Sequence, residues 1–215
     1  MIRSKTLIKI CGITSTEQAL QIAELGVDAI GIISVKESPR YVPALKKREI
    51  FRNLKEFFPN IKRVSVVKNM IIKNNLKNLI DYENVLQLHG DEDHEYCRVL
   101  KTDIPNIEIW KAFRIKTIKD IEDIESYAYL LDAVLLDSWN KETYGGSGIR
   151  IQEELLKKIS INKQWWLAGG ISIDWVKKII EEIRPNGLDI SSSIEKSPGI
   201  KDIEKTKTLL REIRQ

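Results

Sequence analysis

Two residues at the ends of apolar segments have side chains that can move protons. Cys11 directly follows LIKI at residues 7–10, and Asp137 lies in AVLLDS at residues 133–138. A thiolate can act as a base or as a nucleophile, and partial burial can raise the pKa of a carboxyl group into the range of a general acid or base. The pair could therefore carry an acid–base reaction, provided that the fold brings the two segment ends together.

Both residues also allow a purely structural interpretation. Free cysteine is among the residue types most often buried, so Cys11 could simply fill space in the core. A reactive thiolate is favoured if a helix begins directly after the Cys11-Gly12 turn, because the N–H groups and dipole of a helix N-terminus lower a thiol pKa. Asp137 could instead be a structural carboxylate that bonds to loop amides. Cys97 lies within a helical pattern and is predicted to be a packing residue.

Three loops rich in glycine or serine suggest a phosphate site. Backbone N–H groups in such loops, and at the N-termini of short helices, bind phosphate. Each loop alone is weak evidence because glycine turns are common, but the three together favour a phosphate ligand. The loops are YGGSG at 144–148, AGG at 168–170 and ISSS at 190–193, and the candidate phosphate-binding residues are Gly169, Gly170, Ser191, Ser192 and Ser193.

Two further polar side chains follow apolar segments. Arg40 stands in SPRYV, where its planar fork suits a carboxylate and Pro39 restricts the loop; the alternative is a solvated loop charge. His89 follows VLQL and contacts either the substrate or a neighbouring loop. Because neither His89 nor His94, the two histidines of the chain, is clustered with cysteine, no metal site is predicted.

Short apolar segments that could position these residues recur along the whole chain. Eight of them are rich in β-branched residues and are predicted as strands. Several are apolar at almost every position, as expected for a parallel sheet that is covered on both faces. The eight segments are LIKI (7–10), AIGIIS (29–34), IKRVSVV (61–67), VLQLHG (85–90), EIWKAF (108–113), AVLLDS (133–138), WWLAGG (165–170) and GLDISS (187–192).

Segments with an apolar residue at every third or fourth position separate the strands and are predicted as helices. Eight alternating units in one domain predict an α/β fold, a closed (β/α)8 TIM barrel over residues 1–215, with an open doubly wound sheet as the alternative. The active site of such a barrel lies at the C-terminal ends of its strands, where the candidates above stand. The helical segments are TEQALQIAELG (16–26), KKREIFRNLKEFF (46–58), DEDHEYCRVLK (91–101), IKDIEDIESYAYL (118–130), IQEELLKKI (151–159), IDWVKKIIEEI (173–183) and a final amphipathic helix that ends near Ile213.

Local signals predict where some of these helices begin and end. Thr14 and Glu17 have the spacing of a capping box, which would start the first helix directly after the first strand. Gly26 is expected to end that helix, and Ser172 is expected to cap the helix after the seventh strand. The Pro198-Gly199 pair should separate the eighth strand from the final helix.

The composition indicates a globular protein that acts on a small molecule. Hydrophobic residues make up 42% and charged residues 31% of the chain, which argues against disorder. The net charge is +4 and is spread along the sequence, so neither nucleic acid nor a membrane surface is an expected partner. No apolar run approaches the roughly 20 residues of a membrane span and no signal peptide is recognised, so a cytoplasmic location is expected. Both cysteines would remain thiols there.

The order of the short motifs resembles the phosphoribosylanthranilate isomerase family of tryptophan biosynthesis. The motifs run KICGIT, SPRYV, QLHG, LLDS with YGGSG, LAGGI, LDISSSIE and SPGIKD, so the resemblance spans most of the chain. It implies a single (β/α)8 barrel without metal or cofactor. The implied reaction converts N-(5-phosphoribosyl)anthranilate, a phosphosugar, into the carboxyphenylamino-deoxyribulose phosphate by an Amadori rearrangement.

The same resemblance implies a role for most of the candidate residues. Cys11 would be the general base, Asp137 the general acid and Arg40 the anchor for the anthranilate carboxylate. The phosphate would be held by Gly169, Gly170, Ser191, Ser192 and Ser193, and a loop over the substrate would be shaped by Gly146 and Gly148.

The chain departs from the family pattern in three places. Ser65 and Lys68 lie in RVSVVKN, where relatives usually show a glycine-rich stretch, and GIISVKESPRYV lacks the aromatic residue often found after the second strand. Ser193 takes a position that is usually glycine, which matters if that residue needs a positive φ.

Two other functions compete with the isomerase. One is a different phosphosugar-binding (β/α)8 isomerase or lyase; Cys11 together with Arg40 argues against it, because those reactions do not call for this pair. The other is a non-catalytic barrel that serves as a binding or assembly subunit. The oligomeric state is open: a homodimer is one option, and the five tryptophans suit either a core or an interface.

Overall fold

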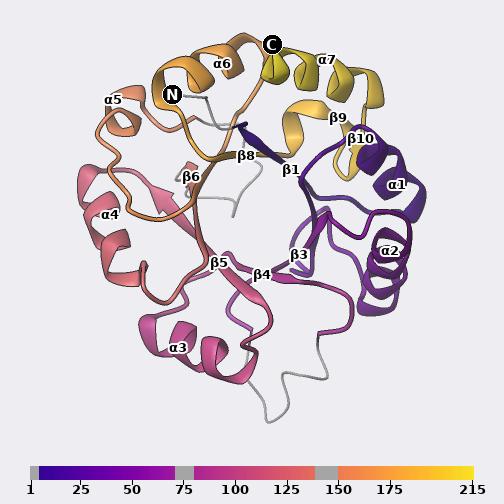
Figure 1. Ribbon diagram of the computed structural model, residues 1–215, viewed down its shortest axis with the longest axis horizontal. Helices are drawn as coiled ribbons and strands as arrows, with labels where there is room; N and C mark the ends of the chain where they lie inside the picture. Colours follow the sequence, from indigo (N-terminus) through magenta and orange to yellow (C-terminus); the bar gives the residue numbers. More distant parts are fainter. Residues whose placement is uncertain (1–4, 71–79, 139–149) are drawn as a thin grey trace.

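Eight parallel strands close into a barrel with helices around its outside (Figure 1). The structure, a computed structural model, describes residues 5–70, 80–138 and 150–215. The strands follow one another around the barrel in sequence order, and β8 pairs with β1 to close it. The predicted (β/α)8 barrel is therefore confirmed, and the open doubly wound sheet is wrong.

All eight predicted strands are present, with ends that differ from the predicted ones by a few residues. They are β1 (Leu7–Cys11), β2 (Ala29–Ile33), β3 (Lys62–Val67), β4 (Val85–Leu88), β5 (Glu108–Ile115), β6 (Ala133–Ser138), β7 (Trp165–Ala168) and β8 (Gly187–Ile190). A short antiparallel hairpin of β9 (Glu195–Ser197) and β10 (Ile200–Lys201) follows the barrel. His89 and the Gly169-Gly170 pair thus lie in the loops that leave β4 and β7.

The helices of the described residues mostly occupy the predicted segments. They are α1 (Thr16–Glu24), α2 (Ala44–Phe57), α3 (His94–Asp103), α4 (Ile118–Glu122), α5 (Glu153–Leu156), α6 (Ile173–Lys178) and α7 (Ile203–Arg214). Three of them are clearly shorter than predicted, α4, α5 and α6, and α6 continues as a π-helix over Ile179–Ile183. None of the helices in the described ranges has the length and apolar character needed to cross a membrane.

The shortening of α4 has a local cause. After Glu122 the chain continues as a 3-10 helix, Asp123–Tyr127, instead of an α-helix. The hydroxyl of Ser126 donates a hydrogen bond to the carbonyl of Asp123 at 2.7 Å. Serine and aspartate side chains compete in this way for backbone groups and so disfavour helix interiors. The apolar spacing in this segment thus marks its buried face but not one continuous α-helix.

The start of α1 differs from the prediction. Ser15, and not Thr14, is the N-cap, and its side chain accepts a hydrogen bond from the N–H of Gln18. The hydroxyl of Thr14 instead donates to the carbonyl of Gly199 at 2.7 Å. The capping box of Thr14 and Glu17 is therefore wrong. The helix itself begins at Thr16, as the apolar pattern predicted.

The other predicted boundaries hold with one change of detail. Gly26 follows α1 with a φ of 73°, as a helix-ending glycine does. Ser172 is the N-cap residue of α6, but its hydroxyl bonds to the side chain of Asp174 and not to the helix backbone. The Pro198-Gly199 pair lies between β8 and α7, in the turn of the hairpin.

The barrel interior contains its own packed cluster, separate from the larger core between strands and helices. The rings of Trp110 and Trp166 fill much of it, with their centroids 4.8 Å apart, and both are fully buried. Small residues surround them: Ala29, Ala112, Ala133, Ala168 and the valines Val64, Val66 and Val85. Trp165 and Trp175 are also buried, so the four tryptophans that the structure describes belong to the core of this chain, and Trp139 lies outside the described residues.

Candidate active site

A cavity of about 420 Å³ opens at the C-terminal ends of the barrel strands. Nine of the residues predicted from the sequence line it: Cys11, Arg40, His89, Asp137, Gly169, Gly170, Ser191, Ser192 and Ser193. Gly146 and Gly148 lie outside the described residues. The expectation that the strand ends converge on one site is thereby met for every predicted residue that the structure describes.

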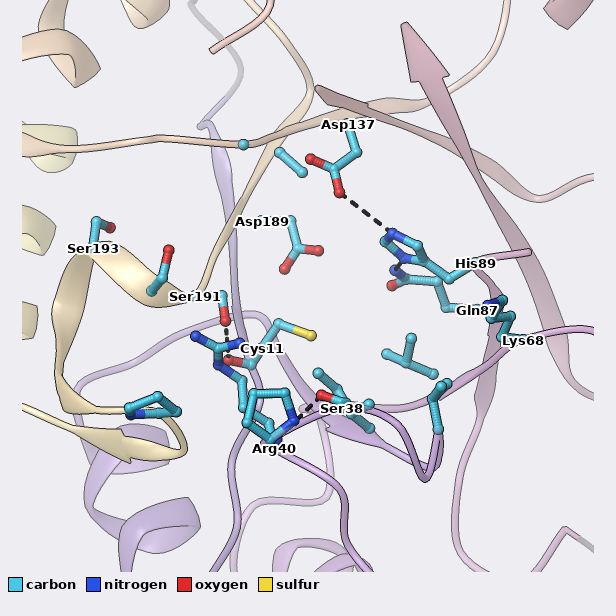
Figure 2. A pocket seen from close by; sticks show the side chains of 18 of the residues that line it. Cys11, Ser38, Arg40, Lys68, Gln87, His89, Asp137, Asp189, Ser191 and Ser193 are labelled. Atoms are coloured by element: carbon cyan, nitrogen blue, oxygen red, sulfur yellow. Dashed lines mark hydrogen bonds and ion pairs between the residues drawn. The ribbon is translucent and has the colours of Figure 1, made fainter. Parts of the chain in front are cut away.

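Cys11 ends β1, and its thiol faces the cavity (Figure 2). The neighbouring strand β2 places Gly31 directly beside it in the ladder. A Cβ atom on Gly31 would lie 2.8 Å from the sulfur, which is closer than non-bonded atoms tolerate. Only glycine therefore leaves room for the thiol in this orientation. On the other side, the hydroxyl of Ser191 donates to the carbonyl of Cys11 at 3.1 Å.

The electrostatic setting of Cys11 differs from the one that the sequence suggested. Burial raises the pKa of its thiol above the ordinary value for cysteine, and the positive charges of Lys9 and Lys201 oppose that rise. The net shift is upward and not the lowering expected beside a helix N-terminus, and the groups that oppose the rise are side-chain charges. Stabilisation of a thiolate here has to come from side-chain charges.

Asp137 lies across the cavity from Cys11, near the end of β6 (Figure 2). It is buried, with 4% of its surface exposed. One carboxylate oxygen, Oδ1, accepts a hydrogen bond from the N–H of Ser138 at 2.8 Å, and the other, Oδ2, lies 3.3 Å from Nε2 of His89. Asp137 thus combines the backbone contact of a structural carboxylate with a position at the cavity wall.

His89 links Asp137 to Gln87. The second ring nitrogen of His89, Nδ1, lies 3.2 Å from Nε2 of Gln87. The imidazole therefore lies between the two side chains, in a row that runs from β4 to β6 (Figure 2), and its Nε2 is near Asp137 without the geometry of a hydrogen bond. His89 lies against the candidate acid and also lines the cavity, so its contact with the substrate stays a prediction. A histidine in that position can orient the carboxyl group and exchange a proton with it.

Arg40 is fixed by a carboxylate from the far end of the chain. Its Nε and Nη2 donate to the two oxygens of Glu195 at 2.8 and 2.7 Å. Lys201 donates to the same carboxylate at 2.7 Å. Although burial opposes it, the two cations hold the pKa of Glu195 below its ordinary value. Arg40 is buried, so the interpretation as a freely solvated charge is wrong.

The loops after β7 and β8 form the wall where phosphate binding was predicted. Gly169 and Gly170 have φ angles of 86° and 62°, a conformation that side chains other than glycine rarely adopt. Ser192 and Ser193 begin a 3-10 helix, Ser192–Ile194, and the first N–H groups of a helix have no acceptor within it. Ser193 does not have a positive φ, so serine at this position causes no backbone strain.

Ser65 and Lys68, the two residues in and after β3 that depart from the family pattern, have separate roles. Ser65 faces away from the cavity, where it accepts a hydrogen bond from Lys47 at 3.2 Å, beside the buried ion pair of Lys47 with Glu83. Lys68, just after β3, lines the cavity. The missing aromatic residue after β2 leaves Ile33 and Val35 at the cavity wall.

Two buried charges next to Cys11 escaped the sequence analysis. Lys9 and Asp189 form an ion pair of 2.7 Å inside the barrel, and Asp189 also lines the cavity. A signal was present, since each is the one charged residue in an otherwise apolar strand segment, and a charge in such a place must be paired. Glu195 and Lys201 were missed for a different reason, because they lie in a hairpin that no strand pattern marked.

Comparison of the sequence with known families finds one match over nearly the whole chain. Residues 8–212 match the family described as N-(5'-phosphoribosyl)anthranilate (PRA) isomerase. The N-(5'-phosphoribosyl)anthranilate isomerase of Thermosynechococcus vestitus is 39% identical over 97% of this chain and 90% of that protein. The enzyme of Crocosphaera subtropica is also 39% identical, over 97% of this chain and 98% of that protein.

Solved structures are similar over the same length. The phosphoribosyl anthranilate isomerases of Thermus thermophilus and Thermotoga maritima superpose with TM-scores of 0.82 and 0.81, at 28% and 29% identity, and each comparison covers 97% of this chain and 98% of the other. A similar structure holds reduced 1-(o-carboxyphenylamino)-1-deoxyribulose 5-phosphate, with a TM-score of 0.77 and 29% identity. Another consists of monomers generated from the dimeric Thermotoga maritima enzyme.

Proposed function

Since this chain belongs to the N-(5'-phosphoribosyl)anthranilate isomerase family, we propose that it carries out the reaction of that family with Cys11 as general base and Asp137 as general acid. It is an isomerase of tryptophan biosynthesis. The reaction converts N-(5-phosphoribosyl)anthranilate into 1-(2-carboxyphenylamino)-1-deoxyribulose 5-phosphate by an Amadori rearrangement. The assignment of each side chain to a step of that reaction is the proposal.

The first step opens the ribose ring. Asp137 gives a proton to the ring oxygen, the bond between that oxygen and C1 breaks, and the aniline nitrogen supplies the electron pair that forms a protonated Schiff base at C1. His89, 3.3 Å from the carboxyl group, keeps it pointed at the cavity. The proton that the C2 hydroxyl group releases in the second step balances the one that Asp137 gives, and its return through solvent regenerates the acid.

The second step removes the proton from C2 of the opened sugar. The Cys11 thiolate takes this proton, and the electron pair of the C–H bond moves to neutralise the Schiff base, which leaves an enolamine. Transfer of a proton to C1, together with loss of the proton from the C2 hydroxyl group, converts the enolamine into the amino ketone product. Acid and base act on neighbouring atoms of one substrate, so they have to reach it from two sides of the cavity.

The observation that carries the proposal is the placement of Cys11 and Asp137. They come from β1 and β6, three strands apart around the closed barrel, and their side chains face one cavity across its width (Figure 2). A substrate bound between them would have one group on each side, which is the arrangement that the two steps need.

The two ends of the substrate carry negative charges, and the cavity offers a group for each. Support for Arg40 as the anthranilate anchor comes from its fixed fork: Glu195 engages Nε and Nη2, which leaves Nη1 without a partner among the described residues. Support for the phosphate site comes from the positive-φ glycines Gly169 and Gly170 opposite the helical turn at Ser192.

Arg40→Lys should raise KM by roughly 10- to 100-fold with a smaller effect on kcat. A hydrogen bond between charged groups is worth about 1.5–3 kcal/mol, and lysine cannot keep the forked contact with Glu195 while it faces the substrate. Initial rates over a range of substrate concentrations measure both constants. Arg98→Lys, on the exposed face of α3 where Arg98 pairs with Glu95, is the matched control, and equal KM values in both variants would exclude Arg40 as the anchor.

The function itself is tested by turnover with the purified protein. The expected result is consumption of N-(5-phosphoribosyl)anthranilate and formation of the deoxyribulose phosphate, without any added metal or cofactor. A panel of other phosphosugars addresses the competing barrel reactions. A protein that leaves phosphoribosylanthranilate unchanged, or that converts another phosphosugar faster, is not the isomerase proposed here.

Three broader properties follow from the same proposal. The whole chain, residues 1–215, would act as one catalytic domain. The mechanism needs Cys11 as a free thiol. This requirement supports a cytoplasmic location for the protein, because thiols stay reduced in the cytoplasm. A second copy of this chain is the proposed partner, by analogy with the dimeric Thermotoga maritima enzyme; a solution mass equal to one chain would exclude it.

A further inference from the structure

The buried ion pair of Lys9 and Asp189 has no part in the steps above. Nζ of Lys9 donates to Oδ2 of Asp189 at 2.7 Å, and the lysine side chain is wholly buried. The two residues are neighbours in the ladder between β1 and β8, at the seam that closes the barrel. A buried ion pair is weak evidence of a stabilising role, because the cost of desolvating both charges can exceed their attraction. A functional explanation is therefore worth testing.

Lys9 lies next to the thiol of Cys11. Residues two apart in a strand point to the same face, so both side chains of β1 enter the barrel interior. The position that a Cβ atom on Gly31 would take shows how close the two groups are. It lies 2.8 Å from the sulfur of Cys11 and 3.2 Å from Nζ of Lys9. The ammonium group and the thiol thus border the same small space.

We propose that Lys9 is a positioning residue for the general base: its ammonium group, held by Asp189, is the counter-charge that stabilises the thiolate of Cys11. This rests on the proposed function of Cys11 as the base. A buried sulfur needs a nearby positive charge to ionise, and the ammonium group of Lys9 borders the same space as this sulfur.

Lys9 is suited to this role because it keeps its charge. Burial works against that charge, but the carboxylate of Asp189 and the sulfur of Cys11 outweigh it and hold the pKa of Lys9 above its ordinary value. Among the groups that favour the thiolate, Lys9 has the largest effect and Lys201 a smaller one, while Asp189 opposes them.

The other charges around the thiol are less free to act on it. Glu195 is bonded to both Arg40 and Lys201 and offsets their charges, whereas Lys9 shares its charge with Asp189 alone among the described residues. The charged groups that face this space or line the cavity around it are Glu37 and Arg40 after β2, Lys68 after β3, His89 after β4, Asp137 on β6, Asp189 on β8, Glu195 on β9 and Lys201 on β10.

Direct titration of the thiol tests the proposal without any substrate. In full-length Cys97→Ala protein, Cys11 is the one remaining cysteine, and the ultraviolet absorbance of its thiolate can be followed against pH. The rate of modification by methyl methanethiosulfonate gives a second measure. Lys9→Met should raise the pKa of the thiol by about 1–3 units, the usual effect of losing an adjacent opposite charge. The pH at which kcat/KM levels off should move upward with it.

Two further variants separate this role from a merely structural one. Lys9→Arg keeps a positive charge at this position, so it should leave the pKa of the thiol well below its value in Lys9→Met; damage to the fold would not be rescued by the conservative change. Lys47→Met breaks a comparable buried pair with Glu83, 2.6 Å apart on the outer face of the barrel, and should leave the titration unchanged.

Each outcome has a defined meaning. A thiol pKa that is the same with and without the Lys9 ammonium, or that moves equally in Lys47→Met, overturns the proposal. If Lys9→Met does not fold, Lys9→Gln decides, because glutamine is uncharged but can still donate a hydrogen bond to Asp189, and an unshifted thiol pKa there has the same consequence. An active enzyme with an unshifted titration contradicts only the role of Lys9, whereas an inactive enzyme contradicts the isomerase function.

Discussion

Replacing Cys11 by alanine should lower kcat by roughly 10²- to 10⁴-fold, the usual contribution of a general base. The sulfur faces the cavity and, in the proposed mechanism, takes the proton from C2 of the opened sugar. Alanine is smaller than cysteine and fits within the space that the thiol occupies beside Gly31, so the barrel should stay folded and KM should change little. Steady-state kinetics and a thermal unfolding curve measure the two effects separately.

The role of Cys11 as the base also predicts the direction in which kcat/KM changes with pH. Burial raises the pKa of the Cys11 thiol, so at neutral pH the thiolate is the minor form. Because the thiolate is the active form, kcat/KM should rise with pH through the neutral range, about tenfold per unit while the pH stays below the pKa. The residual activity of Cys11→Ala should lack this rise.

Cys97→Ala is the matched control for the cysteine variant. Cys97 is a fully buried thiol on α3, away from the cavity, and its removal should cost stability without changing kcat or the pH profile. Equal kcat values in Cys11→Ala and the unchanged enzyme would rule out Cys11 as the base.

Asp137→Asn should also lower kcat by about 10²- to 10⁴-fold, since asparagine keeps the shape of the side chain but cannot give up a proton to the ring oxygen. The N–H of Ser138 donates a hydrogen bond of 2.8 Å to Asp137, and the carbonyl oxygen of asparagine can still accept it. Substrate binding should therefore survive. Binding of the reduced product analogue, measured by calorimetry, should stay close to that of the unchanged enzyme.

Asp103→Asn provides the control for this second variant. It makes the same chemical change at the exposed end of α3, and all kinetic constants should be unaffected. An Asp137→Asn enzyme that retains full kcat would show that ring opening draws its proton from another group, with His89 as the first candidate because of its position 3.3 Å away.

The strands and most strand ends could be predicted because their pattern is local. Each barrel strand is a short apolar run that ends in a polar or glycine residue, and the closed topology then brings those ends together. Cys11 and Asp137 were found in this way although they are far apart in sequence. Arg40 was found through its loop motif, but its main contact was not, because Glu195 lies 155 residues further along the chain.

What escaped prediction depends on contacts between distant segments. Thr14 has the sequence signature of a helix cap, but its hydroxyl finds a better acceptor in Gly199, 185 residues away. The environment of the thiol was misjudged for a related reason, since it is set by Lys9 and by residues of β8 and β10. Lone charges in apolar strands, such as Lys9 and Asp189, are the signal that could have revealed it.

The connection of the first strand to the last also determines when activity can arise during folding. Lys9 and the backbone of Cys11 meet their partners Asp189 and Ser191 across 180 residues of chain, and contacts at such separation are costly to form early. During synthesis Cys11 is made early, and the residues that surround its thiol, Asp189 and Ser191 among them, are made late. In a refolding experiment, recovery of catalysis should lag behind recovery of helical circular dichroism and report the moment at which the seam of the barrel closes.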